Sequence, residues 1–226
     1  MTEERLNKYL AFHLGMSRRE ADLLIEKGSV IINASIAELG ARVKPGDAVS
    51  VNGTPVAKKK GYTTLLFHKP VGYVSSRKQQ GDTPTLYSLL PKEFHNLKPV
   101  GRLDKDSSGL LLLTNDGDFA FQMTHPKFYK IKEYEISLNK PLEPLHQQMI
   151  SDYGVALEDG PSKLSLERRN DERTNWLVTM HEGRNRQIRR TFDTLGYTVT
   201  ALHRISFGPY RLNTIQPGTT VKIDTK

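Results

Sequence analysis

The chain has 226 residues and not one of them is cysteine. Without thiols it can form no disulfide, no thiolate zinc site and no cysteine nucleophile. Long apolar runs are also missing, and no signal-peptide pattern opens the sequence. We therefore expect a soluble, cytoplasmic protein with no membrane partner.

Three common active-site signatures are absent as well. The histidines are dispersed, and none falls at the His-Glu-x-x-His spacing typical of zinc hydrolases. Neither the Gly-x-Ser-x-Gly turn of serine hydrolases nor a Gly-x-x-x-x-Gly-Lys phosphate loop occurs. We therefore expect no bound metal and no cofactor.

Positive charge, by contrast, is in excess. Lysine and arginine outnumber aspartate and glutamate by 33 to 25, which gives a net charge of +8 and a pI near 9.5. Such a field attracts polyanions, and nucleic acid is the leading candidate partner. The 37% hydrophobic content is enough for one well-buried core and a small second domain.

Residues 1–57 form a predicted compact domain that begins with two helices. Apolar residues recur at helical spacing up to a glycine that would end the first helix: Leu6, Leu10, Leu14 and Gly15. Ser17 and Glu20 have the spacing of a capping box, which predicts that a second helix starts here. Two short strands, residues 29–32 and 48–51, are expected on either side of a Lys-Pro-Gly-Asp turn.

A second, larger domain is predicted for residues 62–226. Three lysines and a glycine at residues 58–61 indicate a linker, because like charges in a row repel and are poor core residues. Beyond this linker, strand-like runs alternate with helical segments, which indicates an α+β domain. The predicted strands of this domain are residues 63–67, 110–113, 134–138, 176–180 and 198–202.

The most informative stretch is residues 101–117, which reads Gly-Arg-Leu-Asp-Lys-Asp-Ser-Ser-Gly-Leu-Leu-Leu-Leu-Thr-Asn-Asp-Gly. Arg102 and Asp104 are two residues apart, so an extended chain would put both on one face. The four leucines predict a buried strand that anchors this acidic loop, and the Asn-Asp-Gly turn closes it. For an isolated Arg-x-Asp triplet, a salt-bridged surface turn is the alternative interpretation.

Four arginines lie within residues 184–190, in the order Arg-Asn-Arg-Gln-Ile-Arg-Arg. If a helix begins near residue 185, Arg186, Arg189 and Arg190 are neighbours at i, i+3 and i+4. An aspartate buried against a base keeps its charge only where a cation lies close, and the arginine fork suits a carboxylate. One arginine can thus turn inward while the others meet phosphates. A basic surface helix is the alternative.

As a whole, residues 101–117 resemble the catalytic-aspartate motif of the pseudouridine synthases, in the branch that modifies ribosomal RNA. The resemblance implies an enzyme that isomerises one uridine of 16S or 23S rRNA, with Asp104 as the nucleophile and the target nucleotide flipped out of the RNA. It also implies a monomer that works without cofactor. Its catalytic domain would be built on a mixed, mainly antiparallel sheet.

The same resemblance assigns roles to five more residues. Arg189 matches the family arginine that pairs with the catalytic aspartate, and Ile188 matches the apolar wall beneath the uracil. Arg186 is expected to contact the substrate beside them. Tyr134, in a Lys-x-Tyr strand, would stack on the target base and shuttle a proton, and Arg102 would fill the space left by the flipped nucleotide. A Lys-Pro motif at residues 69–70 is expected to be structural.

The N-terminal residues resemble an S4 RNA-binding domain, at positions 5–10, 15–21 and 46–49. This resemblance implies a small helix-helix-strand fold whose second helix lies against folded RNA. Arg18, Arg19 and Lys27 would then contact phosphates. Asn33-Ala34 stands where an Asn-Gly hairpin turn is expected in such a domain.

Two other functions remain open from the residues alone. A non-catalytic RNA-binding or ribosome-assembly protein would have the same S4 pattern and charge, but would not need Asp104, Tyr134 and Arg189 together. A glycosidase or nucleosidase would use a pair of carboxylates, and three more aspartates lie near Asp104. No acid and base pair is evident, which weakens the glycosidase interpretation. The joint presence of Asp104, Tyr134 and Arg189 favours an rRNA pseudouridine synthase over a protein that only binds RNA.

Overall fold

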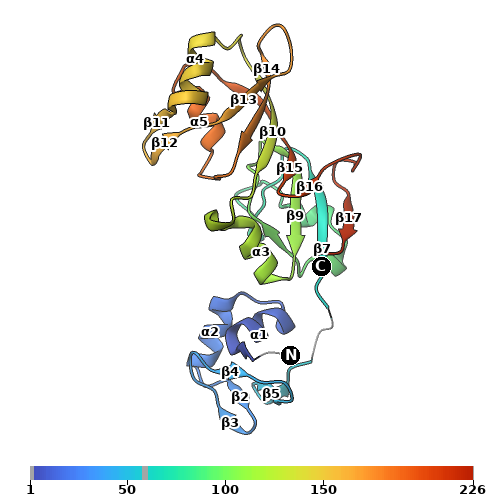
Figure 1. Ribbon diagram of the computed structural model, residues 1–226. Coiled ribbons are helices and arrows are strands. Elements are labelled where there is room, and N and C mark those ends of the chain that lie inside the picture. The colour runs from blue at the N-terminus through green and yellow to red at the C-terminus, as the bar shows by residue number, and fades with distance from the viewer. Residues whose placement is uncertain (1–2, 58–60, 226) are drawn as a thin grey trace. The chain divides into compact units, whose positions relative to one another are not determined.

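The computed structural model describes residues 3–57 and 61–225, and it divides into two compact units, Met1–Tyr62 and Thr63–Lys226. In Figure 1 the first unit is blue and the second runs from cyan to red. Three of the four predicted linker residues, Lys58 to Lys60, lie outside the described residues. The division falls next to the predicted start of the second domain at residue 62. In the described ranges, no helix has the length and apolar content that a membrane crossing requires.

Two capped helices open the first unit. Helix α1 (Leu6–Leu14) ends where Gly15 adopts a left-handed conformation, with φ of 77°, and donates its N–H to the Ala11 carbonyl. Helix α2 (Arg18–Glu26) begins with the complete capping box: the Ser17 hydroxyl accepts from the Glu20 N–H, and the Glu20 carboxylate accepts from the Ser17 N–H. The predicted end of the first helix and the predicted start of the second are therefore confirmed.

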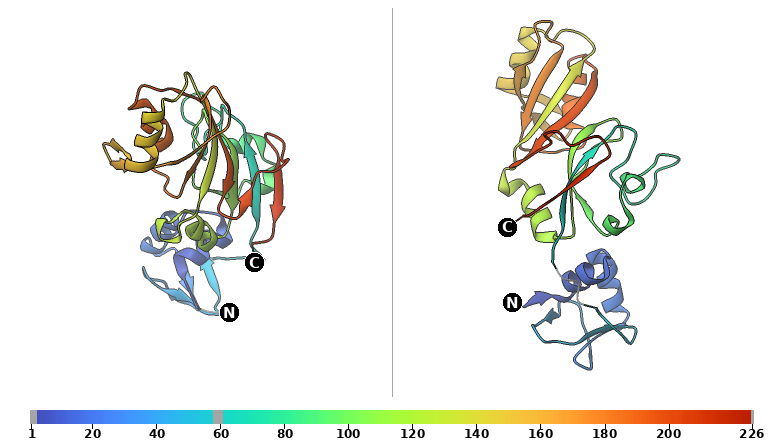
Figure 2. Two further views of the ribbon diagram at one scale, coloured as in Figure 1. Left: turned by 45° about the horizontal axis from the view of Figure 1, so that its top comes forward. Right: turned by 90° about the vertical axis from the view of Figure 1, so that its right-hand side faces the viewer.

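A four-stranded sheet in the order β3-β2-β5-β6 completes this unit, beside a two-stranded β1-β4 pair. The strands are β1 (Glu4–Arg5), β2 (Val30–Ile32), β3 (Ser35–Ile36), β4 (Arg42–Val43), β5 (Val49–Val51) and β6 (Thr54–Pro55). Asn33 and Ala34 both have positive φ, 48° and 70°, so the β2-β3 hairpin keeps a left-handed turn although alanine replaces glycine. Figure 2 shows the two helices on one side of these strands.

A nine-stranded sheet forms the second unit, in the order β13-β14-β10-β15-β9-β7-β17, with β8 on β9 and β16 on β15. These strands are β7 (Thr64–Lys69), β8 (Lys98–Val100), β9 (Ser108–Thr114), β10 (Lys132–Leu138), β13 (Ser165–Arg168), β14 (Asn175–Met180), β15 (Val199–Phe207), β16 (Tyr210–Arg211) and β17 (Thr220–Ile223). Every described pair is antiparallel except β9 with β15. The predicted α+β fold with a mixed, mainly antiparallel sheet is confirmed.

The parallel β9-β15 pair joins the two halves of this sheet. It is short, with Ser108 opposite His203 and Gly109 opposite Arg204. Gly109 has φ of 109°, and a Cβ there would lie 2.2 Å from the Arg204 carbonyl oxygen. No side chain fits in that space, so only glycine lets the two strands approach this closely.

Apolar side chains cover both faces of β9, which explains the run of four leucines. Leu111 and Leu113 belong to the main core, while Leu110 and Leu112 belong to a second cluster with Met123 of helix α3 (Gly117–Thr124). In Figure 1, α4 (Pro144–Gln148) and α5 (Gln187–Asp193) lie beside β13 and β14, whereas α3 lies beside β9. A small hairpin of β11 (Val155–Leu157) and β12 (Gly160–Ser162) lies next to α5.

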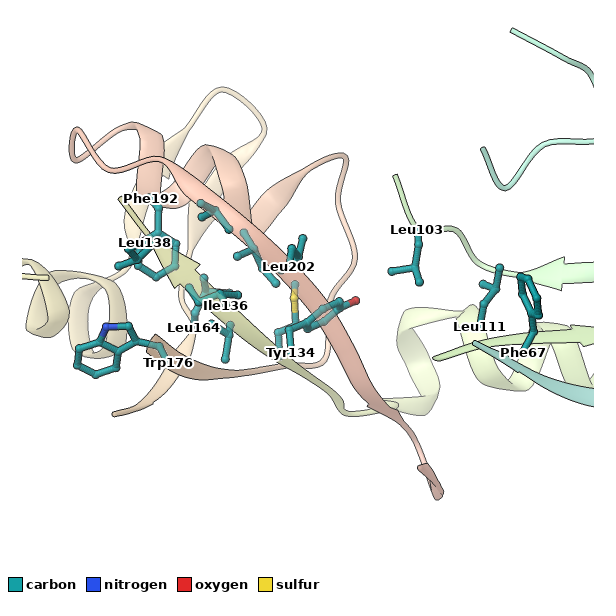
Figure 3. Packing of buried hydrophobic residues seen from close by; sticks show 14 of the residues in the cluster. Phe67, Leu103, Leu111, Tyr134, Ile136, Leu138, Leu164, Trp176, Phe192 and Leu202 are labelled. Carbon is teal, nitrogen blue, oxygen red and sulfur yellow. The ribbon is translucent and has the colours of Figure 1, made fainter. Parts of the chain in front are cut away.

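The main core extends across both halves of the sheet. Figure 3 shows Ile136, Leu138 and Trp176 in one group and Phe67, Leu103 and Leu111 in another, with Tyr134 at the end of the first group that faces Leu103. The remaining short helices are 3₁₀ turns at Leu86–Leu89, Lys92–Phe94 and Pro126–Phe128, and a π-helical turn at Met149–Tyr153. Tyr134 therefore stands where the two parts of the core meet.

Candidate active site

Asp104 lies in the loop between β8 and β9, not in a strand. The buried Lys69 ammonium fixes the backbone of this loop, because its Nζ donates to the carbonyls of Asp104 (2.9 Å), Ser107 (2.7 Å) and Pro70 (3.0 Å). The Ser75 hydroxyl adds a bond to the Leu103 carbonyl at 2.8 Å. The Asp104 backbone is thus held by several groups, while its side chain remains 34% exposed.

Lys69 is an unusual structural residue because it is a fully buried cation. Burial is the main reason that its pKa falls to about 8; Asp104 and Asp106 oppose this shift, and Arg204 adds to it. The sequence marks Lys69 only as part of a structural Lys-Pro motif. Its bonds to three carbonyls agree with that interpretation and show which loop it supports.

A pocket of about 90 Å³ opens above Asp104 and brings together five of the six residues that the sequence singles out for catalysis and substrate binding. These are Arg102, Asp104, Tyr134, Arg186 and Ile188. They come from the β8-β9 loop, from strand β10 and from the start of α5, which are far apart in the sequence. The buried ring of Tyr134 and the buried Ile188 give the pocket apolar walls, and Asp104 gives it a carboxylate.

Arg186 is the arginine that reaches Asp104. Its Nη1 lies 3.4 Å from Asp104 Oδ2 and 3.2 Å from Asp106 Oδ1, and its Nη2 lies 3.3 Å from Asp106 Oδ2. The helix α5 begins one residue after Arg186, which caps it with a left-handed φ of 45°. The prediction that Arg186 belongs to the same helix as Arg189 and Arg190 is therefore wrong, and the sharp turn aims its side chain at the acidic loop.

Arg189 has different partners from those predicted. It donates to the backbone carbonyls of Val199 (2.6 Å) and Asp106 (2.9 Å), and its Nε lies 3.5 Å from the Asp106 carboxylate. The side chain is only 13% exposed. In this structure Arg189 therefore ties the acidic loop to β15 through Asp106, and the cation beside Asp104 is Arg186. Burial would raise the pKa of Asp106, but the hydrogen bond from Arg186 and the charges of both arginines lower it overall.

A cluster of Asp159 with Arg184 and Arg190, which the sequence does not predict, lies beside the pocket. Arg184 donates to the carbonyls of Asp159, Gly160 and Pro161, and both Arg184 and Arg190 pair with the Asp159 carboxylate, at 2.9 and 2.7 Å. This clamp holds the β11-β12 hairpin against α5. The sequence signal was only the density of arginines, because Asp159 is more than twenty residues away and nothing local pairs it with them.

A second, larger cavity of about 630 Å³ adjoins the Asp104 pocket. The two share Arg102, Tyr134, Gly183 and Arg184 as wall residues. Strand β15 contributes the buried Arg204 to this cavity, and Arg204 Nη1 lies 3.4 Å from the Tyr134 hydroxyl. Neither Arg204 nor this cavity was predicted, because a lone arginine in a strand carries no sequence signal.

Three residues were predicted to bind RNA from the first unit. Arg18, Arg19 and Lys27 are all exposed on or just after α2, and Arg18 donates to the Asn7 side chain at 3.2 Å. Their exposure leaves them available to a partner.

As for metals, the described part of the chain holds no group of three or more histidine, aspartate or glutamate side chains placed to ligate an ion.

Comparisons with known proteins agree with this geometry. The family model described as RNA pseudouridylate synthase matches residues 63–194, and the S4 domain model matches residues 4–49. The chain is 37% identical to the ribosomal large subunit pseudouridine synthase B of Bacillus subtilis, covering 95% of this chain and 90% of that one. It is 35% identical to the ribosomal small subunit pseudouridine synthase A of Pasteurella multocida, covering 92% and 90%. A crystal structure of a pseudouridylate synthase superposes with a TM-score of 0.70 at 30% identity, covering 97% and 96%.

Proposed function

Because this chain belongs to the RNA pseudouridylate synthase family, we propose that it isomerises one uridine of ribosomal RNA to pseudouridine. The names of its relatives support ribosomal RNA as the substrate, since they include a large-subunit and a small-subunit enzyme at nearly the same identity. The basic charge of +8 suits such a polyanion. We expect the protein to act as a monomer in the cytoplasm.

The reaction needs a carboxylate, a stacking surface and a space outside the RNA helix, and the Asp104 pocket offers all three. The Asp104 carboxylate attacks the ribose C1′ as the nucleophile, and the bond from C1′ to the uracil N1 breaks. The uracil turns, its C5 bonds to C1′, and the bond from C1′ to the carboxylate breaks. C5 then loses its proton and N1 gains one, so that no atom is gained or lost overall. The target uridine reaches Asp104 by flipping out of the stack, because the carboxylate is inaccessible to a base inside a helix.

The neighbouring side chains hold the base and balance charge. Tyr134 stacks on the detached uracil, and its hydroxyl is the group in the pocket that can carry the C5 proton. Ile188 forms the apolar wall beneath the ring, and Arg102, which is exposed, occupies the gap that the flipped nucleotide leaves. Arg186 pairs with Asp104, and Arg189 acts on the same loop through Asp106. These steps use side chains alone.

The S4 unit supplies affinity. Arg18, Arg19 and Lys27 contact phosphates of folded rRNA, while the second unit performs the chemistry. This division of labour is supported by the separate matches of the two family models to residues 4–49 and 63–194. RNA binding and isomerisation should therefore respond to different substitutions.

The observation that carries the proposal is the partly exposed Asp104 carboxylate in one pocket with Tyr134 and Arg186. Asp104→Asn keeps the shape but removes the nucleophile, so we expect isomerisation to fall at least about a thousandfold with RNA affinity nearly unchanged. Release of tritium from rRNA labelled at uridine C5 measures the rate. Asp118→Asn is the matched control, since it makes the same change at an exposed aspartate that lines neither the pocket nor the larger cavity, and it should leave the activity unchanged.

Pseudouridine mapping in rRNA from cells with and without the gene identifies the target. Loss of one modified position, restored by the wild type and not by Asp104→Asn, is the expected result. If all positions stay modified without the gene and RNA binding persists, the protein is a non-catalytic RNA-binding factor, and the isomerase assignment is wrong.

A further inference from the structure

The large cavity beside the Asp104 pocket contains two cations, Arg204 and Lys132, that form no ion pair with a carboxylate of the described residues. Arg204 is 2% exposed, and its Nε donates to the Leu110 carbonyl at 2.7 Å. Its Nη2 is buried and has no hydrogen-bond partner among the described residues. Leaving a guanidinium nitrogen buried and unpaired is costly, and in native proteins such a group commonly marks a missing ligand.

Lys132 adds a second cation to the same wall. Its Nζ lies 5.4 Å from the centre of the Phe207 ring, and the Arg204 guanidinium lies 5.0 Å from that same centre. Within the described residues, the Lys132 ammonium donates only to backbone carbonyls, those of His181 (3.1 Å) and Glu182 (2.7 Å). Burial lowers its pKa to about 8, with a further contribution from Arg204, although Glu182 opposes both. Two like charges thus share one aromatic ring.

The acidic side chains of this cavity already have partners. Asp159 pairs with Arg184 and Arg190, and Glu182 lies 3.2 Å from Arg184 Nε. Neither carboxylate forms an ion pair with Arg204 or Lys132 in the described part of the chain. An anion from outside the protein would therefore relieve the repulsion between the two cations and satisfy Arg204 Nη2.

We propose that this cavity binds the phosphodiester group next to the target uridine, through Arg204 and Lys132. The inference rests on the proposed function, which supplies the RNA. The cavity and the Asp104 pocket share Arg102 and Tyr134, so a nucleotide whose base enters the pocket carries its own phosphates to the mouth of the cavity. A neutral base in this place would leave both charges uncompensated. Holding the phosphate here fixes the ribose relative to Asp104.

The test uses the full chain and the pentanucleotide AAUAA, whose single uridine fixes the register. Two variants of this RNA each replace one of the phosphodiesters flanking the uridine by a neutral methylphosphonate. For the wild type, we expect one of the two replacements to weaken binding about tenfold, measured by fluorescence anisotropy. Lys132→Gln should bind the native RNA about tenfold more weakly and should no longer respond to that replacement.

Lys127→Gln is the matched control, because it removes one nearby charge that does not line the cavity. It should respond to the methylphosphonate as the wild type does, and circular dichroism should give all three proteins the same Tm. Arg204→Lys serves as a second variant that keeps the charge but loses the fork. Equal responses of the wild type and Lys132→Gln to both replacements would overturn the proposal.

Two further readings separate the possible sources of failure. If inorganic phosphate binding depends on Lys132 while RNA binding does not, the occupant is free phosphate, and the assignment to RNA is wrong. If the coupling between Lys132 and one phosphodiester is present but rRNA gains no pseudouridine, the cavity binds RNA as inferred and the proposed isomerase function fails on its own.

Discussion

The Asp104 pocket and the large cavity that contains Arg204 share wall residues, yet their positively charged side chains have different partners. In the pocket, Arg186 is paired with Asp104 and Asp106 at 3.2–3.4 Å. In the cavity, Arg204 and Lys132 both lie close to the Phe207 ring, and neither forms an ion pair with a carboxylate of the described residues. A paired arginine keeps a carboxylate ionised, whereas an unpaired buried arginine attracts an anion. Arginines in one RNA-binding protein therefore need not all contact RNA.

The largest expected effect removes the frame that holds both cavities. Gly109→Ala puts a methyl group 2.2 Å from the Arg204 carbonyl at the β9-β15 junction, and the left-handed φ of 109° adds strain. We expect a loss of about 3 kcal/mol or more, which corresponds to a fall in Tm of about 6–12 °C for a unit of this size. Thermal unfolding followed by circular dichroism measures it.

Gly117→Ala is the control for this substitution. Its added Cβ meets nothing within 4 Å at the first position of α3, so it should stabilise the protein slightly or leave it unchanged. If Gly109→Ala has the same Tm as the wild type, β9 and β15 do not approach each other as closely as the structure shows.

The next largest effect distinguishes Arg186 from Arg189, the two arginines that contact the acidic loop. Arg186→Lys loses the fork that reaches Asp104, so we expect kcat to fall about tenfold or more while Tm stays constant, because this side chain is 43% exposed. Arg189→Lys should also lower the free energy of unfolding, by about 1–2 kcal/mol, since it gives up bonds to two backbone carbonyls. Arg190→Lys, which pairs with Asp159, should change kcat little. A loss of kcat in Arg189→Lys without any loss in Arg186→Lys would restore Arg189 as the partner of Asp104.

A smaller effect is the dependence of RNA affinity on pH, which we expect from Lys132 in the large cavity. The pKa of Lys132 is about 8, and only its charged form attracts a phosphate, so affinity for RNA should fall as pH rises through that value. The expected decrease is up to about fourfold between pH 7 and pH 8.5. The charged groups that act on this ammonium are Arg204, which lowers its pKa further, and Glu182, which opposes that shift. Lys132→Gln should bind with little dependence on pH; an undiminished dependence would assign it to Lys69, whose pKa is also about 8.

The smallest effect lies in the first unit. Arg18→Gln combined with Arg19→Gln should weaken rRNA binding only a few-fold, and should reduce the slope of log affinity against log salt by about 1.5 because two phosphate contacts are lost. Lys78→Gln combined with Lys92→Gln is the control, since both residues are exposed and line neither the pocket nor the cavity. An equal change of slope in the control would mean that α2 contributes only general charge.

Local patterns were enough to predict much of the fold. The capping box at Ser17 and the glycine after Leu14 fix helix ends through bonds between residues near in sequence, and both are found. The leucine run predicts a strand buried on both faces, and β9 is that strand. Strands β8, β16 and β17 were missed because they are short or polar. Strand β16 forms a tight hairpin with β15, whereas β8 and β17 pair with strands farther away in the sequence.

The sequence by itself determined which residues to look for: five of the six catalytic and substrate-binding candidates line one pocket. Only the tertiary structure decided who pairs with whom. Arg186 reaches Asp104 because the backbone turns left-handed one residue before α5. Arg189 instead donates to the Val199 carbonyl at the start of β15. Arg204, whose Nη2 has no hydrogen-bond partner among the described residues, takes its place only because β9 and β15 meet at Gly109. Motifs encode bonds between neighbours in the chain, but the balance of buried charge depends on all the groups that folding brings together.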